Sequence, residues 1–162
     1  QTSEVCPMRR LMLVVTHLIA LALGFAIGVY TLPILTAPAG PDSAAIDAAA
    51  ASAEFKGAFD RNLKGSDFLH WGEGEVLVMP GKIAHKGRLS PGPDYKLYLT
   101  SDFVDDEASF LKLKDSAARI GDVKSFDGFI LDVPQGIDVA GYTTAVARGK
   151  ALGEFLSAGR RR

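Results

Sequence analysis

The sequence predicts a mainly β fold, a small β-sandwich or barrel with one short helix, preceded by a single N-terminal transmembrane helix. The helix is indicated by residues 11–35, which carry no charged side chain. The β fold is indicated by the chain after residue 54, where short apolar runs alternate with Gly, Pro and Asp. That part has about 108 residues, which is enough for one domain with one core.

Residues 11–35 are predicted to be a transmembrane anchor. Their 25 residues make a helix of roughly 37 Å, which exceeds a bilayer core of about 30 Å. A cleavable signal peptide has a shorter apolar region, so an uncleaved anchor is favoured. Arg9 and Arg10 precede the stretch, and no basic residue follows it until Lys56. The positive-inside rule then places residues 1–10 in the cytoplasm and the C-terminal domain in the periplasm or outside the cell.

Small residues recur every four positions in the predicted anchor, at Ala20, Gly24 and Gly28. That spacing lets two membrane helices approach closely and predicts a dimer through the anchor helix. The competing interpretation is that Gly is simply common in membrane helices. Cys6 is the only cysteine, so an intrachain disulfide is excluded, and Met8 is the expected natural start.

Residues 36–54 are predicted to be a Pro- and Ala-rich linker or stalk. Residues 36–41 contain Pro and Gly and end the anchor helix, whereas residues 43–53 are dominated by Ala. Asp42 or Ser43 is suited to cap a short helix there, although an extended stalk is the alternative. The stretch has too few large apolar residues to be expected in the core.

The β domain is predicted over residues 55–159, with residues 160–162 as a basic, solvated tail. Residues 80–81 and 90–94 are turn signals, because they combine Pro with Gly. In residues 95–99, alternation places Tyr95, Leu97 and Leu99 on one face and Lys96 and Tyr98 on the other. Residues 105–113 have acids first and lysines last, which favours a short helix. The predicted strands are residues 75–79, a strand starting at 82–85, and residues 95–99, 119–120, 128–133 and 142–147.

No catalytic or metal site is predicted, and an enzyme is not expected. His70 and His85 are the only histidines in the domain and lack further ligands in a tight cluster. An acidic cluster at residues 102–107 lacks the spacing of a calcium loop, so a capped, solvated helix start is expected there. Neither a phosphate-binding loop nor a nucleophile elbow occurs. No cofactor is evident, and a net charge of −1 gives no indication of nucleic-acid binding.

Several short motifs follow one another in a characteristic order. They are Phe68-x-His70-x-Gly72-x-Gly74, then residues 92–99 (Gly-Pro-Asp-Tyr-Lys-Leu-Tyr-Leu), residues 121–124, Val133-Pro134, Tyr142 and the closing Gly153-Glu154-Phe155. Over about residues 55–159 this pattern resembles the DM-thirteen domain, also called the electron-transfer DM domain. The family-motif residues are His70, Gly72, Gly74, Gly92, Pro93, Asp94, Leu97, Tyr98, Leu99, Pro134, Tyr142 and Phe155. The resemblance implies a compact β domain with a role in electron transfer.

The sequence departs from this family at one position. The family has an aromatic residue and a cysteine shortly before the closing Phe, where this chain has Arg148 and Gly149. Thiol chemistry needs a sulfur atom that can become a thiolate, and Gly149 has no side chain. The cysteine chemistry that the resemblance implies is therefore not available at this position.

Together these observations predict a membrane-anchored, extracytoplasmic accessory or interaction module of the cell envelope, with an envelope protein or redox partner. One alternative is a ligand-binding or adhesive β-module without redox activity, with a concave patch around residues 91–94. Another is an electron-transfer protein that uses a metal or haem in place of the cysteine. The sequence leaves the partner, the ligand and the oligomeric state open.

Overall fold

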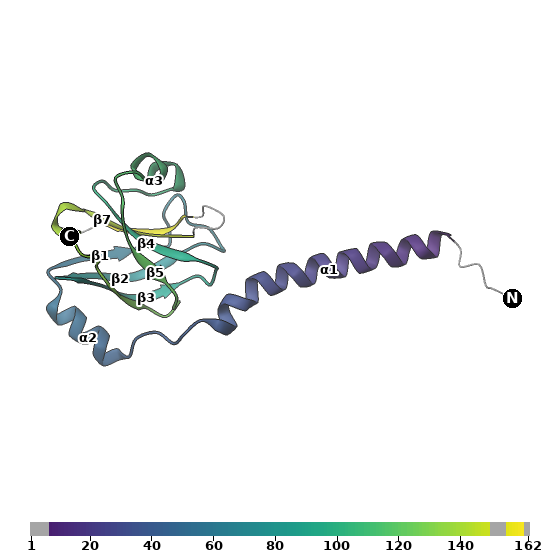
Figure 1. The fold of residues 1–162 in the computed structure, drawn as a ribbon, viewed down its shortest axis with the longest axis horizontal. Helices are drawn as coiled ribbons and strands as arrows, with labels where there is room; N and C mark the ends of the chain where they lie inside the picture. Colours follow the sequence, from purple (N-terminus) through teal and green to yellow (C-terminus); the bar gives the residue numbers. More distant parts are fainter. Residues whose placement is uncertain (1–6, 150–154, 161–162) are drawn as a thin grey trace.

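The computed structural model describes residues 7–149 and 155–160. Three features of the sequence interpretation lie outside the described residues, namely Cys6, the Gly153-Glu154 pair and residues 161–162 of the basic tail. A long helix, α1 (Pro7–Thr36), is followed by helix α2 (Ser43–Ser52) and then by a β domain (Figure 1). The predicted mainly β domain, preceded by a single long N-terminal helix, is confirmed.

The β domain consists of two antiparallel four-stranded sheets. Sheet A has the order β1-β2-β3-β6, with β1 (Phe55–Phe59), β2 (Gly72–Met79), β3 (Lys82–Leu89) and β6 (Phe129–Asp132). Sheet B has the order β5-β4-β7-β8, with β5 (Ala118–Val123), β4 (Tyr95–Thr100), β7 (Thr144–Gly149) and β8 (Phe155–Arg160). Helix α3 (Glu107–Leu113) and a 3-10 turn, η1 (Val139–Gly141), complete it.

Three hydrophobic clusters hold the layers together. The main cluster lies between the two sheets and contains Ile83, Leu97 and Phe129. A second cluster joins α2 to sheet A, and a third joins α3 to sheet B through Phe110 and Val146. The domain is therefore a sandwich whose two outer faces are each partly covered by a short helix, and the alternation predicted for residues 95–99 is confirmed.

The two edge strands β1 and β8 are not predicted by the sequence pattern, because both are short and contain Gly. These glycines allow the edges of the two sheets to cross closely. A Cβ atom on Gly57 would lie 2.8 Å from the carbonyl oxygen of Arg160, and one on Gly159 would lie 2.9 Å from that of Ala58. The contact closes one side of the sandwich.

Helix α2 corrects one expectation, that residues 43–53 contribute nothing to the core. Ile46 and Ala49 are buried against Leu77, Met79 and Ala84 of sheet A. Small Ala side chains let the helix lie close to the sheet, so one large apolar residue is enough to fix it. The Asp42 side chain caps the helix by accepting from the Ala45 backbone N–H at 2.7 Å, as predicted.

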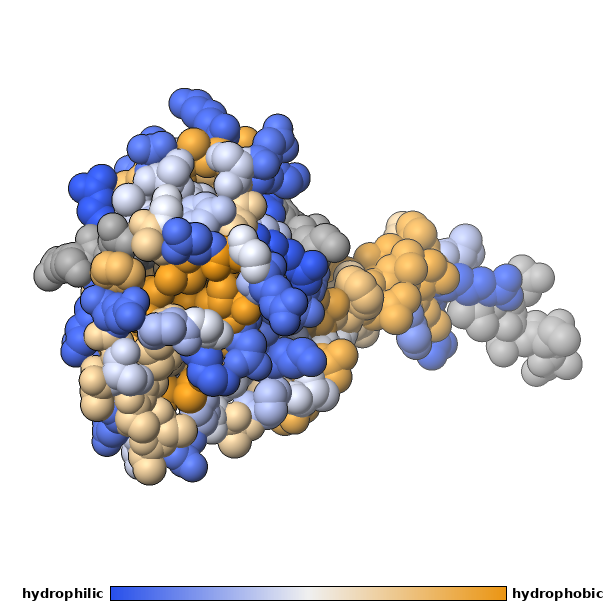
Figure 2. Space-filling model, turned by 60° about the vertical axis from the view of Figure 1, so that its left-hand side comes forward, coloured by the Kyte–Doolittle hydropathy of each residue, from blue (hydrophilic) through white to orange (hydrophobic). Residues whose placement is uncertain are grey.

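Helix α1 is the one helix in the described part that is long and apolar enough to span a membrane, judged by length and composition. None of its side chains is buried in the protein. Figure 2 shows an apolar surface along the visible part of this helix, with hydrophilic residues toward its N-terminal end. An apolar surface of this size is unfavourable in water, which is consistent with the predicted anchor.

Candidate functional site

The position where the family cysteine is expected lies at the end of β7. Gly149 is buried and pairs directly with Tyr95 of β4. Residues directly opposite each other project to the same face of a sheet, and Tyr95 belongs to the core between the sheets. A side chain at position 149 would therefore face the inner core.

Arg148 projects to the other face, beneath α3. Its guanidinium donates to both carboxylate oxygens of Glu107, with Nε–Oε2 at 2.9 Å and Nη2–Oε1 at 2.5 Å. It also lies 5.1 Å from the centre of the Phe110 ring. The Arg148 side chain is only 9% exposed, and its hydrogen bonds to Glu107 raise its pKa. This pair fastens α3 to sheet B, so the residue serves as part of the scaffold.

A second cation lies directly opposite Arg148 in the neighbouring strand. Lys96 of β4 is buried and binds Asp94 and, at 3.1 Å, Asp122. Like charges opposite each other in a sheet repel unless each has its own counterion. The hydrogen bond to Asp94 raises the pKa of Lys96, so this cation stays charged. The outer face of sheet B thus carries a charge-balanced network.

The acidic cluster at residues 102–107 is a capped helix start, as predicted. Asp106 caps α3 by accepting from the Ser109 N–H at 2.7 Å. Lys64 lies 2.6 Å from the same carboxylate, and its hydrogen bond lowers the pKa of Asp106. Among the described residues, no group of three or more His, Cys, Asp or Glu could hold a metal ion.

The family motif around His70 shapes the chain before and within β2. His70 Nδ1 lies 3.0 Å from Asp67 Oδ2, and this contact lowers the pKa of Asp67. Gly72 is packed so tightly that a Cβ atom would lie 2.8 Å from Leu89 Cδ2. Gly74 has a φ of +117°, and a Cβ there would lie 2.4 Å from the Lys86 carbonyl oxygen. The two glycines allow close packing between β2 and its neighbours.

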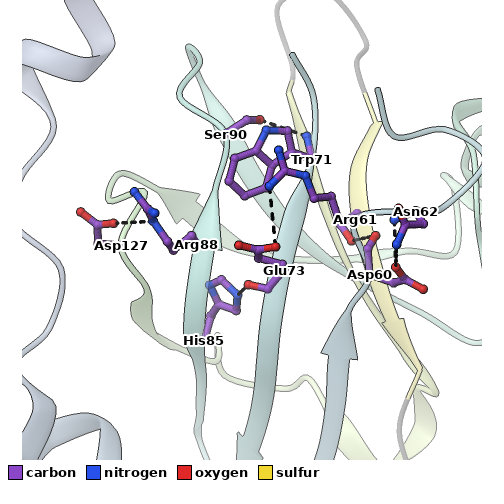
Figure 3. A network of polar contacts seen from close by, with 10 residues as sticks. Asp60, Arg61, Asn62, Trp71, Glu73, His85, Arg88, Ser90 and Asp127 are labelled. Atoms are coloured by element: carbon purple, nitrogen blue, oxygen red, sulfur yellow. Dashed lines mark hydrogen bonds and ion pairs between the residues drawn. The ribbon is translucent and has the colours of Figure 1, made fainter. Parts of the chain in front are cut away.

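His85 lies below this segment in the core between the sheets, fully buried between the rings of Phe59 and Phe129. Its Nε2 lies 3.0 Å from the Glu73 carbonyl oxygen, so Nε2 carries the proton and donates (Figure 3). Its Nδ1 has no hydrogen-bond partner among the described residues. Burial lowers the pKa of His85 to about 4, so the ring is neutral at pH 7. These contacts give His85 a structural role in the core.

Trp71 leads from this segment to the surface. The Arg61 guanidinium lies 3.8 Å from the centre of a Trp71 ring and 3.8 Å from Glu73 Oε2 (Figure 3). The Trp71 backbone N–H donates to Ser90 Oγ at 3.1 Å. Stacking and ion pairing together hold the exposed guanidinium in place.

Arg61 borders a groove of about 480 Å³ beside the β1–β8 contact, called the corner groove below. On its other side, the Arg160 guanidinium lies 4.9 Å from the centre of the Phe103 ring. Its polar lining comes from Asp60, Arg61, Asn62, Glu73 and Arg160, and Phe103 is among its apolar lining residues. Two cations, an amide and two carboxylates are suited to bind peptide or sugar groups rather than to perform covalent chemistry. Sequence reasoning missed this groove because its lining comes from segments far apart in the chain.

The other motif residues have packing roles or lie at the surface. A Cβ atom on Gly92 would lie 2.0 Å from Tyr95 Oη, so only Gly fits there. Leu97 and Leu99 are in the main core, Tyr142 packs against it, and Phe155 lies in the α3 cluster. Tyr98 packs edge-on against Phe110 with ring centres 5.2 Å apart, whereas Pro93 and Pro134 are exposed. In α1, Ala20, Gly24 and Gly28 are exposed.

A second groove lies beside the predicted turn at residues 90–94. It has a volume of about 360 Å³ and runs between residues 92–96 and the C-terminal end of α1. Leu32, Pro33 and Thr36 line the α1 side. A concave surface next to this turn is what the ligand-binding alternative expects.

A protein-family comparison agrees with the motif pattern. The model described as "Electron transfer DM13" matches residues 62–147, just over half of the chain. The match ends directly before Arg148 and Gly149. No curated protein and no solved structure matches the chain.

Proposed function

The chain belongs to the electron-transfer DM-thirteen family, and we propose that it acts as a membrane-anchored interaction module of the cell envelope. The observation that carries this proposal is the Arg148–Glu107 pair beside Gly149. Gly149, at the position where the family resemblance implies a redox cysteine, has no sulfur atom, and the neighbouring Arg148 fastens a helix. The side chains best placed to meet a partner surround the corner groove.

The proposed location is the outer side of a bacterial cytoplasmic membrane. Support comes from the length and apolar surface of α1 and from Arg9 and Arg10 at its N-terminal end. The chain should therefore remain in the membrane pellet after alkaline carbonate extraction. Protease added to spheroplasts should remove the β domain and spare a fragment containing α1. Complete release into the supernatant would contradict the anchor.

The proposed partner is an envelope protein that binds in the corner groove. Arg61 and Arg160 are suited to bind carboxylates or backbone carbonyls, and Phe103 adds an apolar surface. Stacked arginines already have restricted motion, so less side-chain entropy is lost when they bind.

This partner can be tested by crosslinking the full chain in native membranes and identifying the crosslinked protein. We expect Arg61→Ala to lower the yield at least fivefold. Arg88→Ala is the matched control, because Arg88 is also exposed and paired, with Asp127 at 3.5 Å, but lies outside the corner groove. Equal yields for the two variants would contradict a partner in this groove.

Two other functions remain as candidates, each favoured by one observation. The family description favours electron transfer, for which the purified chain should show an absorbing or metal-containing centre. A colourless, metal-free and redox-silent chain would dismiss it. The groove beside residues 92–96 favours a ligand-binding or adhesive module, for which an envelope glycan should raise the melting temperature.

A further inference from the structure

Two neighbouring apolar residues are exposed at the tip of the loop between β1 and β2. The Phe68 residue is 89% exposed and Leu69 is 48% exposed. Outside α1, Leu111 is the only other large hydrophobic residue that is exposed in the described part of the chain. Phe68 and Leu69 are adjacent and so form a continuous exposed apolar surface, which is typical of a contact site, whereas Leu111 stands alone.

The tip has a fixed shape that turns these residues outward. Asp67 Oδ1 accepts from the backbone N–H groups of Leu69 and His70 at 2.7 and 2.8 Å. The Asp67 N–H donates to the His70 carbonyl oxygen at 2.9 Å, and the His70 ring contacts the Asp67 carboxylate. Phe68 is thus presented by a closed turn, and little conformational entropy is lost when it makes a contact.

This tip lies at the end of the sandwich that faces α1. The loop leads into β2 at Gly72, which pairs with Leu89 at the end of β3. Trp71 and Ser90 join it to the turn at residues 90–94, since the Ser90 N–H donates to the Trp71 carbonyl oxygen at 2.9 Å. The next residues, 92–96, border the groove whose other side is the C-terminal end of α1. Figure 1 shows α1 extending away from this end of the domain.

The linker holds the domain in this orientation. A Cβ atom on Gly40 would lie 1.9 Å from the Asp127 carbonyl oxygen, so the linker backbone rests directly on the loop between β5 and β6. Helix α2 then runs along the outer face of sheet A, fixed by Ile46 and Ala49. A bilayer spanned by α1 would therefore lie next to the loop end of the sandwich.

From this arrangement we propose that Phe68 and Leu69 insert into the boundary between lipid headgroups and acyl chains, as a second membrane contact of the domain. The inference rests on the proposed membrane anchoring by α1. Because the anchor already holds the domain at the surface, a small apolar tip is enough to keep it bound. Phe and Leu side chains are favourable at this depth, as they are on the apolar face of helices that lie in the membrane interface.

The test uses the full chain with Cys6→Ser, reconstituted in nanodiscs of phosphatidylethanolamine and phosphatidylglycerol. Single cysteines carry an environment-sensitive fluorophore, and spin-labelled lipids quench it according to depth. The proposal predicts that labels at Phe68→Cys and Leu69→Cys are quenched at least twofold by lipids labelled near the headgroup. The matched control is Leu111→Cys, an exposed apolar residue of α3, which should stay unquenched.

A label at Phe25→Cys, within α1, separates the two proposals. Quenching at Phe25 by lipids labelled deep in the acyl chains, without quenching at Phe68 and Leu69, overturns the membrane contact and leaves the anchor intact. That result would assign the tip to an envelope protein partner, which is absent from the reconstituted nanodiscs. Absence of quenching at Phe25 overturns the anchor and with it the contact that rests on it. Equal quenching at Phe68 and Leu111 also overturns the proposal.

Discussion

Single glycines in β2 and its turn show how the same backbone conformation can have different consequences. Gly74 and Gly81 both have positive φ values, +117° and +76°. Around Gly74 a Cβ atom would meet the backbone of β3, whereas around Gly81 nothing lies within 4 Å. A residue with a Cβ atom would strain the backbone at both positions. Only at Gly74 would that atom also overlap with neighbouring backbone.

We predict that Gly74→Ala lowers the free energy of unfolding by about 3 kcal/mol. The matched change Gly81→Ala should lower it by only about 1 kcal/mol, because strain is its sole effect. Urea unfolding of the detergent-solubilised chain measures both, with Trp71, the only tryptophan, as the fluorescence probe. Equal effects would mean that β3 moves aside for the Gly74 methyl group.

The single residue His85 makes the free energy of unfolding depend on pH. Its pKa is about 4 in the folded chain because the ring is buried, against about 6.5 when unfolded. Between these values the unfolded chain binds more protons, so stability falls as the pH is lowered from about 6.5 to 4.

We predict a loss on the order of 3 kcal/mol over that interval. His85→Leu should flatten the dependence between pH 6.5 and 4, while the carboxylates with lowered pKa values, Asp67, Asp106 and Asp122, still act below about pH 4. Urea unfolding at several pH values measures this. An unchanged slope in His85→Leu would show that other groups cause the dependence.

At the scale of elements, the two short helices are held by different forces. Helix α2 is held mainly by apolar contacts, whereas α3 combines Phe110 with the Arg148–Glu107 pair. Half-buried charge pairs with two hydrogen bonds stabilise more than exposed pairs, since less solvent screens them.

We predict that Arg148→Ala destabilises the domain by about 2 kcal/mol, because Glu107 loses both hydrogen bonds. Hydrogen exchange in α3 should rise in parallel. Lys82→Ala is the control, since the Lys82–Asp132 contact is also 2.5 Å long but both side chains are more than half exposed. It should leave stability unchanged within error. A similar loss in both variants would contradict the role given to burial.

At the scale of the whole molecule, α2 decides how the β domain sits relative to α1. The short chain between the two helices allows many orientations by itself. Contacts of Gly40 with Asp127 and of Ile46 with sheet A select one of them. The domain's loop end then faces the end of α1.

We predict that Ile46→Ser releases α2 from sheet A. Hydrogen exchange over residues 43–52 should increase at least tenfold, because the only large apolar side chain of the helix is lost. Ala48→Ser, on the exposed side of α2, is the control and should change little. If hydrogen exchange did not increase in Ile46→Ser, the linker contacts at Gly40 would be sufficient to hold α2 on sheet A.

The sequence predicted well those features that depend on neighbours along the chain. The apolar run of α1, the Pro80-Gly81 turn, the alternation in β4 and the capped start of α3 all follow from local pattern. The glycine at position 149, where the resemblance implies a cysteine, was also visible, because it needs only the residue type.

Other features depended on contacts between distant residues and could not be predicted. Strands β1 and β8 have weak hydrophobic patterns because they contain glycines where the two strands cross closely. Helix α2 is buried against sheet A, whose strands come from residues that follow it in the sequence. The partner of Arg148 lies 41 positions away, and the corner groove draws on β1, β2 and β8.

The sequence by itself therefore determined a membrane-length helix, a mainly β domain of the DM-thirteen family and the lack of a side chain at position 149, since these rest on composition and local spacing. Only the tertiary structure decided that Arg148 fastens α3, that His85 is buried and neutral, and that Phe68 and Leu69 are exposed. The reason is physical. These side chains become buried, paired or oriented only when the two sheets pack, and their separation along the sequence does not predict which of them come into contact.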